Sequence, residues 1–134
     1  MKRWIIAFIV ILIVLGGVTL IMALWPKVDM NFATKGKAIF RYEEKNIVQT
    51  ISANDLTKLY DLFEGKRLYS DDLSCGFSEN IAIVINESEQ FHFACDSCPI
   101  VYWKNKNKFF KLSASEYDEL MEILRGYGFA FPCV

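Results

Sequence analysis

The apolar residues of this chain follow two different patterns before and after Pro26. From Trp4 to Trp25 the sequence reads WIIAFIVILIVLGGVTLIMALW and holds no charged residue. A helix of about 20 apolar residues spans the roughly 30 Å hydrocarbon core of a bilayer, and tryptophan rings favour the headgroup layer at its two ends. After Pro26 the apolar positions recur at strand and helix spacings between polar turns. The pattern predicts a transmembrane helix over residues 4–25 and a folded domain after it.

A cleaved signal peptide is the competing interpretation of the apolar segment. Signal peptides have an apolar core of about 7–15 residues and a small-x-small cleavage site. The segment here is longer, and Ile21-Met22-Ala23 matches such a site poorly, so we expect an uncleaved signal-anchor. A short charged N-terminal tail usually stays in the cytoplasm while long domains translocate. We therefore expect a single-pass protein of the cell membrane with its C-terminal domain on the extracytoplasmic side.

Two segments of the domain align without gaps at an offset of 61 residues. Ala38–Lys66 reads AIFRYEEKNIVQTISANDLTKLYDLFEGK, and Pro99–Tyr127 reads PIVYWKNKNKFFKLSASEYDELMEILRGY. In both, a polar turn separates two apolar runs, and a Ser-x-x-acidic capping signal then opens a helix. We interpret the segments as a ββα unit used twice. We expect Gly65 and Gly126 to end the two helices in left-handed conformations.

Between these units, residues 78–86 and 90–96 alternate apolar and polar side chains, which predicts a third hairpin. Pairing Ile85 with Phe91 places alternate residues of both strands on one buried face and His92 on the opposite, exposed face. The domain then reads β-β-α-β-β-β-β-α. The expected fold class is α+β, with an antiparallel sheet and both helices on one face of it.

The predicted organisation is a short N-terminal tail (residues 1–3), the transmembrane helix (4–25), a juxtamembrane linker (26–37) and the α+β domain (38–134). The whole chain has a net charge of −1, which argues against a nucleic-acid partner. A domain of this size buries a limited core, so covalent cross-links would contribute much to its stability.

The cysteines form the one chemical constellation that the sequence offers. In an oxidising compartment, four cysteines in a small domain imply two disulfides. Cys75 precedes the strand that pairs with the strand ending at Cys95, and Cys133 follows the second helix as Cys75 follows the first. We expect Cys75 and Cys133 each to reach one member of the Cys95/Cys98 pair, and we favour Cys75–Cys98 with Cys95–Cys133.

Two other interpretations of the cysteines stay open. Cys95-Asp96-Ser97-Cys98 is a C-x-x-C motif, which performs thiol–disulfide exchange where a helix follows the first cysteine. Here Pro99 and a strand-like run follow. Alternatively, the four thiolates of Cys75, Cys95, Cys98 and Cys133 could hold a tetrahedral zinc ion in a cytoplasmic adaptor, although the usual pattern is two C-x-x-C pairs.

No cluster of polar side chains has the spacing of a catalytic site, and His92 is the single histidine. We therefore favour a binding, sensor or inhibitory module over an enzyme, and we expect no catalytic residue, resident metal or cofactor. The expected partners are the membrane, through residues 4–25, and a protein at or outside it. The surfaces that offer recognition are the sheet face away from the helices and the loop Lys66–Cys75.

Overall fold

The computed structural model describes residues 2–71 and 75–133. The helices are α1 (Lys2–Ala23), α2 (Ala53–Phe63) and α3 (Ala114–Gly126), with a 3₁₀ turn, η1 (Lys104–Lys106). The strands are β1 (Gly36–Tyr42), β2 (Lys45–Thr50), β3 (Phe77–Ile85), β4 (Glu89–Ala94), β5 (Ile100–Trp103) and β6 (Lys108–Lys111). After α1, this is the predicted element order.

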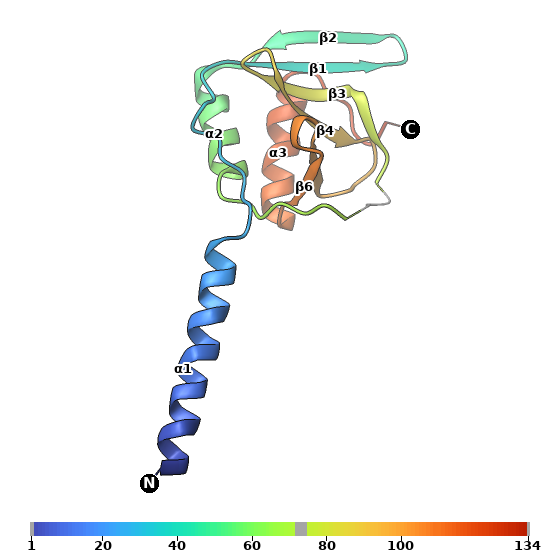
Figure 1. The fold of residues 1–134 in the computed structure, drawn as a ribbon. Coiled ribbons are helices and arrows are strands. Elements are labelled where there is room, and N and C mark those ends of the chain that lie inside the picture. Colours follow the sequence, from blue (N-terminus) through green and yellow to red (C-terminus); the bar gives the residue numbers. More distant parts are fainter. Residues whose placement is uncertain (1, 72–74, 134) are drawn as a thin grey trace.

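The six strands form one antiparallel sheet in the order β2-β1-β3-β4-β5-β6. Helices α2 and α3 lie on one side of the sheet, and α1 projects from the end of the domain opposite β2 (Figure 1). The predicted α+β fold class is therefore confirmed. None of the residues of α1 is buried, so this apolar helix has no partner within the described chain.

The sheet face that meets α2 and α3 is apolar, because alternate residues of each strand point toward it. Three of its phenylalanines are at most 1% exposed, namely Phe40 in β1, Phe91 in β4 and Phe110 in β6. The helices contribute an inward stripe of large apolar side chains, namely Leu59, Leu62, Phe63, Leu120, Met121 and Leu124. The burial of these aromatic and aliphatic groups is the main force that holds the helices on the sheet.

The predicted register of the β3–β4 hairpin is wrong by two residues. Ile83, and not Ile85, lies opposite Phe91, while Ile85 lies opposite Glu89. The turn is the physical reason, since Asn86 and Glu87 take left-handed conformations (φ 50° and 67°) and close the hairpin before residue 89. A two-residue shift keeps every side chain on its predicted face, so the inward isoleucines stay buried.

The two ββα units lie at opposite edges of the sheet, each with its second strand outermost. Ser52 and Ser113 cap α2 and α3 by accepting a hydrogen bond from the backbone N–H three residues later. The units differ at their turns, because Tyr42 pairs with Lys45 whereas Trp103 pairs with Lys108. The second turn is therefore two residues longer, which the ungapped sequence alignment does not show.

The helix ends match the prediction at one glycine and not at the other. Gly65 follows α2 with a φ of 73°, as expected for a left-handed stop. Gly126 instead remains within α3, and the left-handed residue is Gly128, with a φ of 91°. The helix runs further because the N–H groups of Tyr127 and Gly128 still bind its last carbonyls.

Residues 26–37, expected as a linker, pack into the domain over much of their length. Val28 and Met30 are 1% and 0% exposed and belong to the hydrophobic core. Backbone hydrogen bonds join Val28 to Gly65 and to Lys66. Apolar residues at 28, 30 and 32 alternate with polar neighbours, which is the pattern of a short strand. The prediction of a linker did not take this alternation into account.

Asn86 fixes the far end of this segment. Its side-chain oxygen accepts hydrogen bonds from the backbone N–H groups of Thr34 (3.1 Å) and Lys35 (3.2 Å), and its side-chain nitrogen donates to the carbonyl of Phe32. Its own backbone N–H donates to the carbonyl of Lys35 at 3.0 Å. One amide therefore ties residues 32–35 to the β3–β4 turn.

Replacing this amide should loosen the segment from the domain. We expect Asn86→Ala to lower the free energy of unfolding by about 2–3 kcal/mol, because side-chain hydrogen bonds are lost and alanine is disfavoured at a positive φ. Chemical denaturation followed by circular dichroism measures the change. Asn80→Ala, the same substitution at an exposed strand position, should cost under about 0.5 kcal/mol. Equal losses at both positions would contradict the assigned role of Asn86.

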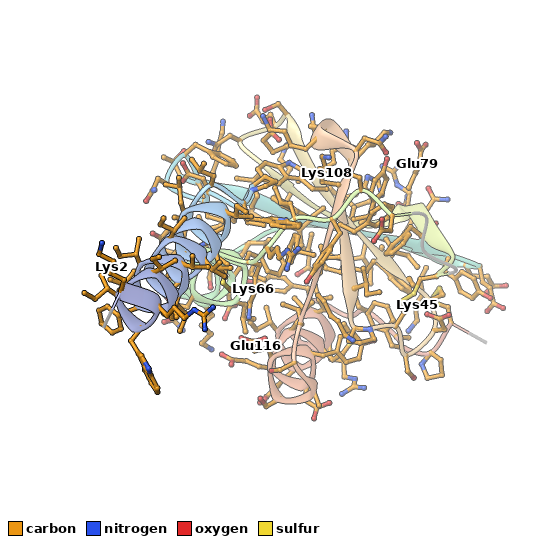
Figure 2. All side chains as sticks on the ribbon, turned by 60° about the horizontal axis from the view of Figure 1, so that its bottom comes forward. Lys2, Lys45, Lys66, Glu79, Lys108 and Glu116 are labelled. Carbon is orange, nitrogen blue, oxygen red and sulfur yellow. A yellow bond between two sulfur atoms is a disulfide. The ribbon has the colours of Figure 1, made fainter. Side chains whose placement is uncertain are left out.

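Two polar contacts join the helices and their flanks. The Tyr127 hydroxyl donates to Asp55 Oδ2 at 2.7 Å and accepts from the backbone N–H of Ser52 at 2.9 Å. Lys66 binds Glu116 at the start of α3, and the two side chains lie next to each other in Figure 2. The hydrogen bond from Tyr127 holds the pKa of Asp55 below its usual value, and the one from Lys66 does the same for the pKa of Glu116.

These lowered pKa values predict a loss of stability in acid. Because the folded pKa lies below the unfolded one, the stabilisation is complete above the unfolded pKa and disappears as the pH falls through the folded pKa, below about pH 4. We expect Tyr127→Phe to cost about 1–2 kcal/mol at pH 7. The difference from the wild type should shrink at pH 2.5. Unfolding free energies measured at both pH values test this, and a pH-independent difference would refute the assigned link to Asp55.

Candidate functional site

Two disulfides cross-link the domain at the end of β4. Cys75 is bonded to Cys98, and Cys95 to Cys133, with Cα–Cα distances of 6.2 and 5.0 Å. These are the pairs that the sequence analysis favoured. Cys133 is 8% exposed, and its backbone N–H also donates to the carbonyl of Cys95. The C-terminal tail is thus tied to the sheet by both a covalent and a hydrogen bond.

This pairing does not resemble the site of a thiol–disulfide exchanger. In such a site the two cysteines of the C-x-x-C motif bond to each other in the oxidised state. Here Cys95 and Cys98 bond to different, distant partners, and β5 rather than a helix follows them. Cross-linked sulfurs are not thiolates, so they do not supply the ligand set of a zinc site. Within residues 2–71 and 75–133, no group of three or more His, Cys, Asp or Glu side chains is placed to hold a metal ion.

His92 lies on the sheet face away from the helices, yet it is 2% exposed rather than a surface side chain. Its Nδ1 lies 2.8 Å from the carbonyl oxygen of Ser78, and its Nε2 lies 3.1 Å from Gln90 Oε1. An irregular stretch of β3 covers it, because the pairing with β4 shifts between Phe77 and Ala82. With both ring nitrogens engaged and the ring buried, His92 is a structural residue of this face.

The loop Lys66–Cys75 was expected to offer a recognition surface, but its first residues pack against another part of the chain. Its first residues lie beside the chain that follows α1: the N–H of Leu68 donates to the carbonyl of Pro26, and Trp25 Nε1 donates to the carbonyl of Leu68 at 3.2 Å. The Arg67 guanidinium lies 3.2 Å from the centre of the Trp25 ring, a cation–π contact. Residues 72–74 of this loop lie outside the described residues.

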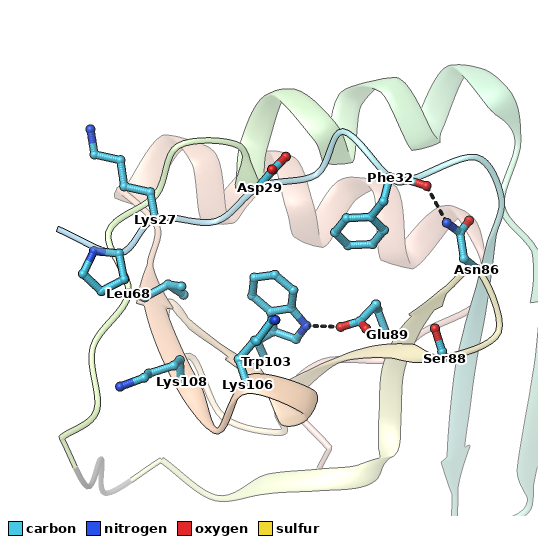
Figure 3. A pocket seen from close by; sticks show the side chains of 11 residues that line it. Lys27, Asp29, Phe32, Leu68, Asn86, Ser88, Glu89, Trp103, Lys106 and Lys108 are labelled. Atoms are coloured by element: carbon cyan, nitrogen blue, oxygen red, sulfur yellow. Dashed lines mark hydrogen bonds between the residues drawn. The ribbon is translucent and has the colours of Figure 1, made fainter. Parts of the chain in front are cut away.

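A cavity starts at this junction. It has a volume of about 690 Å³ and lies between residues 26–32, Leu68, the β3–β4 turn and the β5–β6 turn. We call it the junction groove. Lys27, Leu68 and Lys108 lie at one end of it and Asn86 and Ser88 at the other, with Trp103 between them (Figure 3). Its full lining is Pro26, Lys27, Asp29, Phe32, Leu68, Asn86, Ser88, Glu89, Trp103, Lys106 and Lys108.

The floor of the junction groove is aromatic and fixed. Trp103 is 4% exposed, stacks on Phe32 with ring centres 6.3 Å apart, and contacts Phe91 at 5.1 Å. Its Nε1 donates to Glu89 Oε2 at 2.7 Å, which prevents the ring from turning. A groove with an apolar floor and a few polar groups is typical of small-ligand sites, whose volumes are about 300–1,000 Å³.

The rim of the junction groove carries three lysines and two carboxylates, a net charge of +1. Within the described residues Lys27, Lys106 and Lys108 form no ion pair, and Lys106 Nζ lies 5.7 Å from the centre of the Trp103 ring. The two carboxylates already accept hydrogen bonds, Glu89 from Trp103 and Asp29 from the backbone N–H of Asn31. The groove therefore suits an anionic ligand with an apolar part.

The residues that line this groove are far apart in the sequence, so no local pattern predicts it. Residues 104–108 read KNKNK, which are basic residues confined to a turn. The fold adds Lys27 from a segment 77 positions earlier in the chain, and this long-range pairing cannot be derived from local spacing. Comparisons of the chain with protein-family models, with curated proteins and with solved structures found no match.

Proposed function

We propose that this protein is a single-pass membrane-anchored binding module whose domain lies on the extracytoplasmic side and whose ligand site is the junction groove. The observation that carries the proposal is the packed connection between α1 and the domain. α1 is the one helix of the described chain that is long and apolar enough to cross a membrane, and such an N-terminal helix serves as an anchor or as a signal sequence. The two disulfides fit an oxidising compartment.

The connection supports a function at the membrane surface rather than away from it. A flexible tether would let the domain move freely relative to α1. Here hydrogen bonds join Trp25, Pro26 and Val28 to residues 65–68 of the domain. The end of the groove that Lys27 lines then sits at the base of the domain, next to α1. A site in this position can bind a membrane component or a partner held in the same membrane.

The direct test is the state of the full chain in the cells that make it. We expect the protein to remain in the membrane fraction after carbonate extraction, and we expect its measured mass to include residues 1–25. We also expect protease added to intact cells or spheroplasts to digest the domain, and thiol reagents to label none of the four cysteines before reduction. A soluble protein trimmed near Ala23, a protected domain, or four reactive thiols would each overturn the proposal. The last result would favour the zinc-binding adaptor.

A further inference from the structure

We infer that the junction groove binds the headgroup of an anionic phospholipid from the leaflet in which α1 ends. This inference rests on the proposed membrane anchoring and adds the class of ligand. Three observations carry it: the position of the groove along the membrane normal, its unneutralised lysines, and its fixed apolar floor.

The position follows from the length of α1. Its 22 residues extend about 33 Å at 1.5 Å per residue, which is enough to cross a hydrocarbon core of roughly 30 Å. Ala23 then lies near the boundary of the core. Lys27 is four residues further on and cannot lie more than about 14 Å beyond Ala23. The headgroup layer of one leaflet is roughly 5–8 Å thick, so this end of the groove lies in or just above it.

The charges select the headgroup. Within the described residues, four lysines of the domain pair with a carboxylate, namely Lys35, Lys58, Lys66 and Lys104. The three lysines of the groove rim do not, and among the unpaired lysines these three are the ones that line one cavity. The lining holds three lysines and two carboxylates, a net charge of +1, so a phosphate in the groove would pair with lysines that no carboxylate contacts within the described residues. A zwitterionic lipid also carries a phosphate, but its ammonium group would bring a positive charge toward the same lysines. The geometry therefore favours a lipid with a net negative charge.

The floor accounts for the apolar part of the ligand. Phe32, Leu68 and Trp103 present apolar surface beside the lysines, and the indole of Trp103 is held in place by Glu89. The glycerol backbone and the first methylene groups of a lipid can lie on this surface while the phosphate stays at the rim. Because the leaflet holds such lipids at a high effective concentration, a weak intrinsic affinity is sufficient for occupancy.

The test uses the full chain in nanodiscs of equal parts phosphatidylcholine and phosphatidylglycerol. Native mass spectrometry of the released protein counts the lipids that remain bound. We expect retained phosphatidylglycerol to exceed phosphatidylcholine by about tenfold. The Lys27→Gln/Lys106→Gln/Lys108→Gln variant should abolish this preference, because it removes all three positive charges that line the groove. Equal retention of the two lipids by the wild type would overturn the inference.

The control variant changes the net charge by the same amount away from the groove, at Lys37, Lys45 and Lys111. Lys45 lies on the side of the domain opposite α1 (Figure 2), and none of the three lines the groove. This variant should keep the preference of the wild type. If it loses the preference equally, the effect is one of net charge and the inference is wrong. Should the first triple variant unfold, the Lys27→Gln/Lys106→Gln variant, which keeps the contact between Lys108 and Ser70, replaces it.

A free anion is distinguished from a lipid in a separate arm. The full chain in a zwitterionic detergent is titrated with inorganic phosphate, and the NMR signals of the three groove lysines are followed. Saturation at millimolar phosphate with no lipid preference in nanodiscs would overturn the lipid assignment. If the chain stays in the nanodisc but shows no lipid selectivity, the proposed membrane anchoring is supported and the proposed lipid site is overturned. If the chain leaves the nanodisc, the proposed function itself fails.

Discussion

Removing the Cys95–Cys133 disulfide is expected to cost the domain about 4 kcal/mol, a large share of the 5–15 kcal/mol that stabilises a typical domain. The bond joins residues 38 positions apart, and in the chain-entropy model a loop of that length contributes about 3.9 kcal/mol. Cys133 is also buried, so its replacement by alanine leaves a gap against the sheet. The second disulfide spans 23 residues and should contribute about 3.4 kcal/mol.

Urea unfolding of the full chain in micelles, followed by circular dichroism, measures both effects. The Cys95→Ala/Cys133→Ala and Cys75→Ala/Cys98→Ala variants each remove one complete bond and leave no unpaired thiol. Both should unfold at lower urea, the first at the lower concentration. Reducing agent added to the wild type should lower the midpoint below that of either variant. A wild type that reductant leaves unchanged would show that the sulfurs do not stabilise the domain.

Most of the fold could be predicted from the sequence because helix starts and buried strand faces depend on residues that are close together in the chain. The capping serines at 52 and 113 begin the helices, and the alternation in β3 and β4 assigns the buried face. The register of that hairpin was wrong because it depends on the conformation of Asn86 and Glu87, and the sequence does not show which residues of a polar turn take a positive φ.

The candidate site was predicted less well, since its parts come together only in the folded chain. The order of the elements predicted that Cys75 and Cys133 each reach one member of the Cys95/Cys98 pair, and the favoured choice between the two possible pairings is the one that the structure has. The junction groove forms because residues 26–32 cross in front of Trp103 instead of leaving the domain, and this packing is visible only in the structure. Taken alone, neither the basic turn at 104–108 nor the segment after α1 indicates this contact.

The packing of residues 26–32 yields the second large prediction. Met30 is 0% exposed, and its replacement by alanine should lower the free energy of unfolding by about 2–5 kcal/mol. Met30→Leu, which keeps most of the volume, should cost less than about 1.5 kcal/mol. The backbone N–H of Val28, which donates to the carbonyl of Lys66 at 2.8 Å, should exchange slowly with solvent in the wild type and faster in Met30→Ala.

Met22→Ala is the matched control, because the same side chain lies 65% exposed on α1 and contacts no part of the domain core. In micelles this change should leave the unfolding of the domain unaltered. If residues 26–37 were a flexible linker, both substitutions would be silent and the N–H of Val28 would exchange at the rate of an unfolded chain. That result would also remove Phe32 from the floor of the junction groove and Lys27 from its rim, since these two residues reach the groove only while this segment is packed.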